Sequence, residues 1–299
     1  MSIASCKYRG RFAPSPSGPL HFGSLVAAMG SYLDARHNQG EWLVRIEDLD
    51  PPREQPGAAK RILSTLEAFG FEWDGEILYQ SRPDRADAYR KALHELSEQG
   101  STYLCSCSRK EVNEAGKMGA EGPIYPGTCR KKPSVQQSAR TIRIRTMACN
   151  VGFHDLIFGY VKQNIFAESG DFIIRRADGL FAYQLAVVVD DAFQKITRVV
   201  RGSDLLLSTP RQIWLQQLLG LPTPVYAHLP LVRDSLGRKL SKQSQAQPIS
   251  DRRPLPALLA AWHFLNQVSP ENEPENLKIF WKWAIEKWDI TRISTDMIV

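Results

Sequence analysis

Long apolar segments are missing from this 299-residue chain. No run approaches the roughly 18–20 apolar residues that a membrane-spanning helix needs. The N-terminus carries Lys7, Arg9 and Arg11 but lacks the apolar segment of a secretion signal. We therefore expect neither a membrane protein nor a secreted one, and predict a cytoplasmic location.

Cysteine is scarce, and the five cysteines are Cys6, Cys105, Cys107, Cys129 and Cys149. An odd number without a secretion signal argues against a disulfide framework and favours metal binding or inert thiols. Cys105 and Cys107 are close enough for two thiolates to bind one tetrahedral ion, and Cys129 adds a third across a Gly/Pro-rich hairpin. By residue type, Cys149 and His154 are candidates for a fourth ligand. The alternative is a set of reduced thiols in a basic loop.

Acidic residues are outnumbered, which leaves a net charge of +6 and a pI of about 9.1. Residues 105–149 hold nine Lys/Arg against three Asp/Glu. This local excess predicts a polyanionic partner, and nucleic acid in particular.

The segment Arg9–Ser24 combines a short strand, a Gly/Pro-rich turn and the start of a helix. The strand is expected over residues 9–13, and the helix from Leu20, with Leu25, Met29 and Leu33 on one face. The free N–H groups of such a helix start attract phosphates, and His21 could donate to the same anion. An ordinary surface loop is the alternative.

Strands and helices alternate along the first hundred residues, which predicts a parallel sheet with right-handed crossovers. We expect strands at 41–46, 77–80, 102–104, 141–145, 157–163, 172–175, 197–201 and 225–232, and helices at 54–70, 85–99, 205–219, 255–267 and 275–288. We expect the fold class to be α/β, a doubly wound, Rossmann-like parallel-sheet core with a cysteine-bearing insert and a small helical C-terminal part. The expected division is 1–104 and 150–245 for the two halves of the core, 105–149 for the insert and 246–299 for the tail.

A second loop carries Lys239-Leu240-Ser241-Lys242 after Gly237 and Arg238. Two lysines three residues apart could neutralise charge on a transferring phosphoryl or nucleotidyl group. Taken alone, a solvated basic loop is the competing interpretation.

Together, His21-Phe22-Gly23-Ser24 and Lys239-Leu240-Ser241-Lys242-Gln243 resemble the two signatures of class I aminoacyl-tRNA synthetases. The stretches RFAPSPSGPLHFGSL, LVRIEDLDPPR and VVRGSDLLLSTPRQIWL resemble the glutamyl branch, over residues 9 to about 245. Within it, the chain most resembles the glutamyl-queuosine tRNA(Asp) synthetases, shortened paralogues of glutamyl-tRNA synthetase. Only 57 residues follow Lys242, so we expect no anticodon-binding domain. The chain departs from the usual class I signatures at two positions. Ser24 stands where other class I enzymes have a second histidine, and Gln243 stands where a serine is common.

Glutamate has two carboxylates and one ammonium, so its site needs cations and a carboxylate. Arginine binds both oxygens of a carboxylate, which makes Arg11 and Arg201 candidates. Ser15 can add a hydroxyl, Glu47 can pair with the ammonium, and Tyr183 can supply a phenol. By resemblance, the glutamate contacts are Arg11, Phe12, Ala13, Pro14, Ser15, Glu47, Tyr183 and Arg201.

The resemblance also implies a reaction. Glutamate is activated with ATP to glutamyl-adenylate without tRNA, and then joined to queuosine at the wobble position of tRNA(Asp).

The implied catalytic residues are His21, Lys239 and Lys242; the ATP contacts are His21, Gly23, Ser24 and Lys242. One structural Zn²⁺ would be held by Cys105, Cys107, Tyr125 and Cys129, and Mg²⁺ would accompany ATP. We expect a monomer. The alternatives are a truncated glutamyl-tRNA synthetase that charges tRNA(Glu), a non-catalytic tRNA-binding paralogue, and a ligase acting on a small molecule.

Overall fold

The computed structural model describes residues 7–131, 141–233 and 247–295. The lysine loop, with Lys239 and Lys242, lies outside the described residues. Within the described part of the chain, no helix is long and apolar enough to cross a bilayer.

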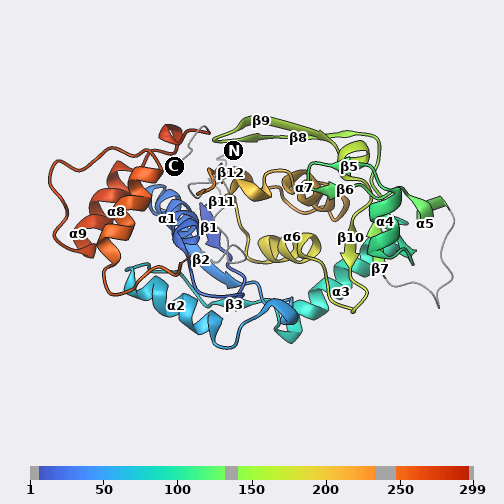
Figure 1. The fold of residues 1–299 in the computed structure, drawn as a ribbon, viewed down its shortest axis with the longest axis horizontal. Helices are drawn as coiled ribbons and strands as arrows, with labels where there is room; N and C mark the ends of the chain where they lie inside the picture. The colour runs from blue at the N-terminus through green and yellow to red at the C-terminus, as the bar shows by residue number, and fades with distance from the viewer. Residues whose placement is uncertain (1–6, 132–140, 234–246, 296–299) are drawn as a thin grey trace, which may run out of the picture.

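Two groups of parallel strands form the centre of the molecule (Figure 1). The first group is β1 (Arg9–Phe12), β2 (Glu41–Ile46) and β3 (Leu78–Tyr79). The second is β11 (Arg198–Gly202), β12 (Val225–Leu229) and β8 (Asn150–Asp155), with β9 (Gly159–Asn164) antiparallel at its edge. The Thr197 N–H donates to the Arg9 carbonyl at 2.9 Å, which joins β1 to the start of β11. This arrangement confirms the predicted α/β fold class.

Helices flank these strands: α1 (Phe22–His37), α2 (Ala58–Ala68), α3 (Pro83–Glu98), α6 (Tyr183–Phe193) and α7 (Thr209–Leu218). The predicted apolar face of α1 is confirmed, because Leu25, Met29 and Leu33 are completely buried. The helix begins at Phe22 rather than Leu20, since His21 keeps an extended backbone and caps it. At Gly30, an added Cβ would lie 2.6 Å from Leu229 Cδ1. A side chain there would push α1 away from β12.

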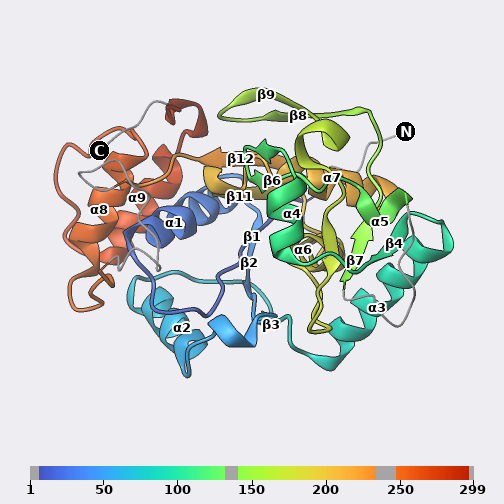
Figure 2. The same ribbon diagram turned by 45° about the vertical axis from the view of Figure 1, so that its right-hand side comes forward.

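The predicted insert contributes β7 (Thr141–Ile144) to an antiparallel sheet, the insert sheet, in which β7 lies between β4 (Thr102–Cys105) and β10 (Ile173–Arg175), two strands at or beyond the predicted bounds of the insert. Beside it lie α4 (Arg109–Ala115), the β5–β6 hairpin (Met118–Gly119 and Gly122–Pro123) and α5 (Thr128–Lys131). The strand predicted at 102–104 therefore pairs antiparallel and outside the parallel sheet. Figure 2 brings this end of the molecule forward.

The strand predicted at 157–163 is partly wrong. Residues 150–164 form the β8–β9 hairpin, and Asp155 Oδ1 accepts the N–H groups of Ile157 and Phe158 in its turn. The short remaining elements are the 3₁₀ turns η1 (Pro51–Arg53), η4 (Ser203–Leu205) and η6 (Ile290–Arg292) and the π-helical turn η3 (Ile165–Ser169).

The tail contains α8 (Pro254–Phe264) and α9 (Leu277–Lys287), the two helices expected from the sequence. They pack at the α1 end of the molecule, opposite the insert (Figure 1). Indole groups attach them to the core: Trp281 Nε1 donates to the Phe69 carbonyl at 2.9 Å, and Trp288 Nε1 donates to Asp34 at 3.2 Å. The tail therefore completes the hydrophobic core around α1.

Replacing Trp262 should reveal how strongly the tail is attached. Trp262 is fully buried in the core cluster that includes α1 and α9. We expect Trp262→Ala to lower the free energy of unfolding by about 3–5 kcal/mol through lost apolar contact and a residual cavity. The measurement is guanidinium denaturation. The matched control is Ile279→Ala on α9, where the side chain is exposed and the expected change is within about 0.5 kcal/mol. Equal effects of the two changes would contradict this account of the tail.

Candidate functional site

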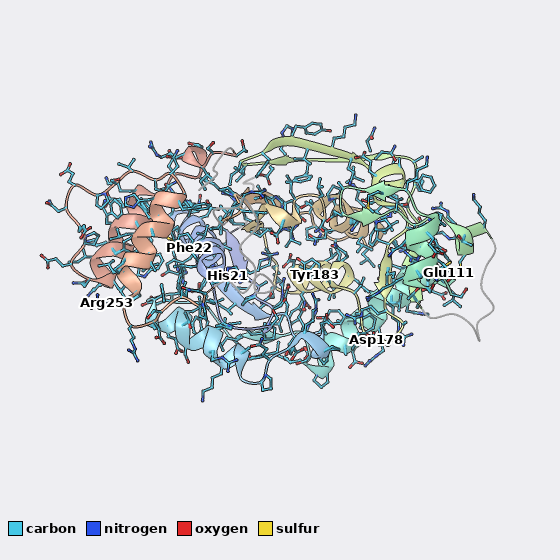
Figure 3. All side chains as sticks on the ribbon, in the orientation of Figure 1. His21, Phe22, Glu111, Asp178, Tyr183 and Arg253 are labelled. Atoms are coloured by element: carbon cyan, nitrogen blue, oxygen red, sulfur yellow. The ribbon has the colours of Figure 1, made fainter. Side chains whose placement is uncertain are left out.

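Four side chains proposed for glutamate binding gather where parallel strands end. Arg11 lies in β1, Glu47 directly follows β2, Arg201 lies near the end of β11, and Tyr183 is the first residue of α6. In open α/β sheets, ligands bind outside the carboxyl ends of the strands. Figure 3 shows Tyr183 near the middle of the molecule. The structure thus brings together residues separated by up to 190 positions in the sequence.

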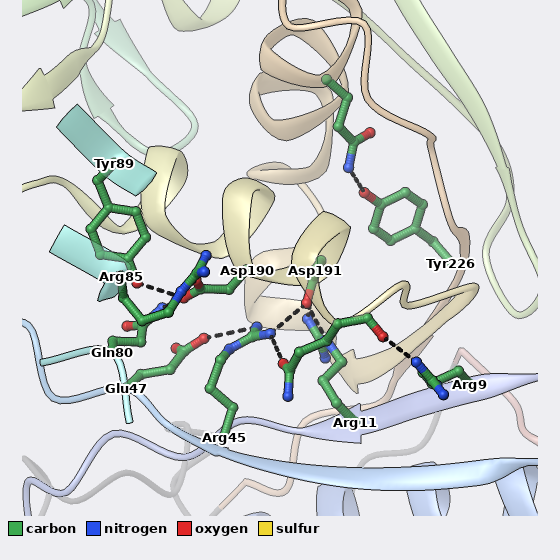
Figure 4. Close-up of polar contacts among 12 residues, drawn as sticks. Arg9, Arg11, Arg45, Glu47, Gln80, Arg85, Tyr89, Asp190, Asp191 and Tyr226 are labelled. Carbon is green, nitrogen blue, oxygen red and sulfur yellow. Dashed lines mark hydrogen bonds and ion pairs between the residues drawn. The ribbon is translucent and has the colours of Figure 1, made fainter. Parts of the chain in front are cut away.

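A cluster of buried, oppositely charged side chains lies at these strand ends (Figure 4). Asp191 on α6 accepts from Arg11 Nε at 3.1 Å and from Arg45 Nη1 at 2.8 Å. Arg45 Nη2 also lies 3.3 Å from Glu47 Oε1. Burial alone would raise the pKa of Asp191, but Arg11 and Arg45 outweigh burial and lower it. Asp191 is therefore ionised, and it fixes the position of both arginines.

A second buried carboxylate lies one residue away. Asp190 accepts from Arg85 Nε at 2.8 Å, from Gln80 Nε2 at 2.7 Å and from Tyr89 Oη at 2.7 Å. These contacts attach α3 and the segment after β3 to α6. The sequence left open whether Asp190 and Asp191 belong to the site or cap a helix. Asp191 contacts the site residue Arg11, and Asp190 contacts Gln80, which lines the cavity described below.

Arg201 is held by an uncharged partner. Its Nε donates to His228 Nε2 at 3.1 Å, and its Nη2 donates to Thr209 Oγ1 at 2.8 Å. His228 Nδ1 lies 2.6 Å from Asp155 Oδ2, so the ring proton is on Nδ1 and Nε2 is free to accept. Burial lowers the pKa of His228 to about 4, despite the hydrogen bond to Asp155.

The remaining guanidinium nitrogen of Arg201, Nη1, is buried and has no hydrogen-bond partner among the described residues. A buried donor without a partner is costly, and a ligand carboxylate would satisfy it. Arg201 is thus an oriented cation with one unused donor group.

A cavity of about 240 Å³ lies beside this cluster, and Ser15, Glu47 and Tyr183 line it together with Arg176. Burial raises the pKa of Tyr183; Glu47 raises it further, while Arg201 and Arg11 oppose the shift. Burial also raises the pKa of Glu47, against the influence of Arg45 and Arg11. Both shifts have the direction expected for a phenol and a carboxylate whose burial outweighs the nearby guanidinium groups.

The intervening residues 12–14 act mainly through the backbone. Phe12 is buried and stacks on Trp42 at 6.2 Å, so its side chain belongs to the core. The Pro14 carbonyl accepts the Glu47 N–H at 3.0 Å, which holds the segment after β1 against the segment after β2. Ala13 lies between them in the extended stretch after β1.

The histidine signature lies at the start of α1, with Gly23 and Ser24 in the first turn. His21 Nδ1 accepts the Ser24 N–H at 3.3 Å, so the helix start also sets the orientation of the imidazole. Pro248, which follows the lysine loop in the sequence, pairs with His21 as a β-bridge. Lys239 and Lys242 themselves lie outside the described residues.

Three of the four proposed metal ligands form a compact thiol cluster, and the fourth adjoins it. The ligand sulfurs of Cys105, Cys107 and Cys129 all lie within 4.8 Å of one another. Cys107 Sγ is 3.5 Å from Cys129 Sγ, and Tyr125 Oη is 3.4 Å from both Cys105 Sγ and Cys107 Sγ. Donor atoms of a tetrahedral site with metal–sulfur bonds of about 2.3 Å are separated by roughly 3.8 Å, so these side chains fit a four-coordinate ion.

The other candidates by residue type lie elsewhere. Cys149 packs against the hydrophobic cluster that includes Leu96 and Leu185, and the His154 ring contacts the Tyr160 ring at a tilted angle on the β8–β9 hairpin, with 5.0 Å between the ring centres. Neither belongs to the group of potential ligands among the described residues.

Three functional residues were missed from the sequence: Arg45, His228 and Asp155. Arg45 was detectable, because a charge within the apolar strand EWLVRI must be paired when it is buried. His228 lies in the similarly apolar VYAHL. In the sequence, Asp155 looks like an ordinary aspartate at a turn. Nothing in the neighbouring residues predicts its hydrogen bond to His228.

Known proteins resemble this chain over nearly its whole length. Residues 7–253 match the family model described as tRNA synthetases class I (E and Q), catalytic domain. The chain is 54% identical over 295 residues to the glutamyl-Q tRNA(Asp) synthetase of Dechloromonas aromatica (strain RCB), covering 98% of this chain and 97% of that protein. It is 52% identical over 291 residues to the protein of the same name from Neisseria meningitidis serogroup C (strain 053442), covering 96% and 97%.

The fold is also similar to a solved structure. The crystal structure of glutamate-tRNA synthetase from Elizabethkingia anophelis superposes with a TM-score of 0.79 at 24% sequence identity. The match covers 97% of this chain and 67% of that one. The similarity concerns the fold alone.

The buried histidine predicts a specific pH dependence. The folded-state pKa of His228, about 4, lies below its unfolded value of about 6.5, so the unfolded chain binds this proton more tightly. Its contribution to stability is complete above pH 6.5 and is lost as the pH falls toward 4. At pH 5 we expect a loss of about 2 kcal/mol relative to pH 7 from this group.

Urea denaturation at both pH values measures the loss, and His228→Gln, which has no titrating ring, should reduce the difference by that amount. Imidazole ¹⁵N resonances should show neutral His228 with its proton on Nδ1 at pH 5.5. A charged ring at that pH would contradict the assignment.

Proposed function

The chain belongs to the glutamyl-Q tRNA(Asp) synthetases within the class I tRNA synthetases, and from this membership we propose how its residues act. The enzyme activates L-glutamate with ATP and then transfers glutamate to the queuosine of tRNA(Asp). The observation that carries the residue assignment is the convergence of Arg11, Glu47, Tyr183 and Arg201 at the strand ends, with a donor of Arg201 unused.

In the first step, a glutamate α-carboxylate oxygen attacks the α-phosphorus of ATP. A bond forms from that oxygen to phosphorus, the bond to the β-phosphate bridge breaks, and pyrophosphate leaves. Arg201 Nη1 and Arg11 supply donors to the carboxylates, Tyr183 adds a phenol O–H, and Glu47 pairs with the ammonium. Ser15 and the backbone of residues 12–14 complete the pocket. No covalent enzyme intermediate is required.

The phosphates are assigned to the start of α1. Backbone N–H groups of Gly23 and Ser24 and the imidazole of His21 would contact them, with Lys239 and Lys242 neutralising the charge that develops. The pairing of Pro248 with His21 supports this placement, since Pro248 follows Lys242 by six residues. Mg²⁺ bound with ATP would supply further charge neutralisation.

In the second step, a hydroxyl of the queuosine cyclopentenediol attacks the activated carbonyl. An ester bond forms to the carbonyl carbon, the bond from that carbon to the phosphate oxygen breaks, and AMP leaves, its phosphate taking up the hydroxyl proton. We propose a cytoplasmic monomer with the core halves 1–104 and 150–245, the basic insert 105–149 and the tail 246–299.

The identity of the labelled RNA tests this function. With radiolabelled glutamate and ATP, we expect label on tRNA(Asp) that contains queuosine and none on tRNA(Asp) with guanosine at the wobble position. Nuclease mapping should locate the label in the anticodon loop. Exchange of pyrophosphate into ATP should depend on glutamate but need no RNA, which excludes a non-catalytic paralogue. Label at the 3′ end of tRNA(Glu) would instead establish a truncated glutamyl-tRNA synthetase.

We also propose that the thiol cluster holds one structural Zn²⁺ through Cys105, Cys107, Cys129 and Tyr125. Three thiolates and a phenolate around Zn²⁺ would leave excess negative charge, and Arg143 is placed to offset it. Its Nε donates to Cys105 Sγ at 3.3 Å, and its guanidinium lies 3.8 Å from the centre of the Tyr125 ring. A closed site with four protein ligands fastens the insert and takes no part in the chemistry.

Metal content and stability test the zinc proposal. The protein should contain one zinc per chain by elemental analysis, and Cys129→Ser should lose most of it and unfold at a lower temperature. Cys149→Ser is the control, because this thiol lies outside the cluster. Zinc retained by Cys129→Ser at the wild-type level, or lost equally from Cys149→Ser, would contradict the assignment.

A further inference from the structure

A second and larger cavity, of about 740 Å³, lies between the insert and the core. Its walls come from both parts of the molecule: Asn113 on α4 and Glu121 of the β5–β6 turn on one side, and Gln184 on α6 and Arg211 on α7 on the other. Its volume lies in the range of small-molecule pockets, about 300–1,000 Å³, and is ample for one nucleoside.

The two cavities share a wall. Arg176 lines both of them. At the start of α6, Tyr183 faces the glutamate cavity, and the next residue, Gln184, lines the larger one. Transfer of a glutamyl group requires the carbonyl and the accepting hydroxyl to lie about 3–3.5 Å apart. A nucleoside in the larger cavity would approach the glutamate from across the first turn of α6.

The larger cavity lies away from the proposed phosphate site. Figure 3 shows Tyr183 between His21 on one side and, on the other, Glu111 on α4 and Asp178, which lines this cavity. ATP at the start of α1 and a nucleoside in this cavity would therefore reach the glutamate from different directions.

The lining combines charged and neutral polar groups. Of its four arginines, Arg176 contacts Asp50 at 3.0 Å and Asp178 at 2.7 Å, and Arg211 contacts Glu121 at 3.1 Å. Arg143 donates to Cys105 Sγ and to the Asp171 carbonyl, and Arg109 is the fourth. Neutral polar side chains lie among them and can form hydrogen bonds with a nucleoside. Gln184 Oε1 accepts from Gln212 at 2.9 Å, which leaves its own amide N–H groups to donate.

One further donor lacks a partner. The Nε of Arg211 is buried and has no hydrogen-bond partner among the described residues. Queuosine offers a base edge of donors and acceptors, a diol, and a secondary ammonium that Glu121 and Asp178 could attract. Single-stranded RNA loops are commonly recognised through bases that leave the stack and enter such pockets.

We propose that this cavity between insert and core is the binding site of the accepting nucleoside, the modified base of a single-stranded RNA loop. The assignment rests on the proposed function and adds a location to it. The insert thus contributes a wall to the site of transfer.

A bulky side chain at Asn113 should block the cavity. Asn113 lies on the exposed face of α4, so Asn113→Trp can fold normally. The matched control is Glu114→Trp, the adjacent residue of the same helix, which does not line the cavity and whose side chain is 64% exposed. Each protein is offered an anticodon stem-loop of tRNA(Asp) that carries queuosine, and glutamate-dependent pyrophosphate exchange is measured without RNA.

We expect Asn113→Trp to lower kcat/KM for transfer by about tenfold or more, the order of one lost base contact, with pyrophosphate exchange at the wild-type rate. Glu114→Trp should match the wild type in both assays. Free queuosine nucleoside should inhibit transfer by the wild type and less so by Asn113→Trp.

Equal transfer by the two tryptophan variants would overturn the assignment. So would parallel losses of exchange and transfer in Asn113→Trp, because the cavity would then serve activation. A wild-type enzyme that leaves the queuosine stem-loop unlabelled would instead overturn the proposed function, and the cavity assignment with it, whatever the variants do.

Discussion

The contact between Asp191 and its two arginines is the interaction on which the rest of the structure depends. Arg11 and Arg45 come from β1 and β2 in the first half of the core, and Asp191 comes from α6 in the second half. Burying such charges is expensive, and one left without its partner costs several kcal/mol more. The three groups are therefore stable together only when both halves have assembled. The strand ends that bear Glu47 and Arg201 then come into place around Tyr183.

This arrangement also determines which charge is left for a ligand. Arg11 and Arg45 are balanced by Asp191 and Glu47 at short range. Arg201 instead faces the neutral ring of His228, and Asp155 lies beyond that ring. The buried Nη1 of Arg201 therefore keeps a charged donor group without a partner among the described residues. A substrate with one more carboxylate than ammonium complements such a pocket, and glutamate has that balance.

Local signals in the sequence predicted the elements, and tertiary contacts determined what the sequence could not. The Gly/Pro-rich turn, the apolar face of α1 and the two tail helices follow from spacing and backbone chemistry, and they formed close to the expected residues. The pairing of Arg45 with Asp191 spans 146 positions, and that of His228 with Asp155 spans 73. No local pattern chooses between such partners. Likewise, the apolar residues of β4 are compatible with either a parallel or an antiparallel neighbour, and only the return of the chain at β7 decides it.

One continuous segment of the chain connects the insert sheet to Tyr183 of the glutamate pocket. Strand β10 of the insert sheet runs into a turn closed by the bridge between Arg175 and Phe181. The Ala182 N–H then donates to the Ile174 carbonyl at 2.9 Å, immediately before Tyr183 begins α6. Tyr183 therefore takes its position from the sheet that contains β4 and β7, and β4 ends at Cys105 of the thiol cluster. A metal that fastens this cluster would stabilise the wall between the two cavities through covalent continuity and backbone pairing, and two of its proposed ligands, Cys107 and Tyr125, themselves line the larger cavity. For this reason a structural ion that takes no part in the chemistry can still determine how accurately the glutamate and its acceptor meet.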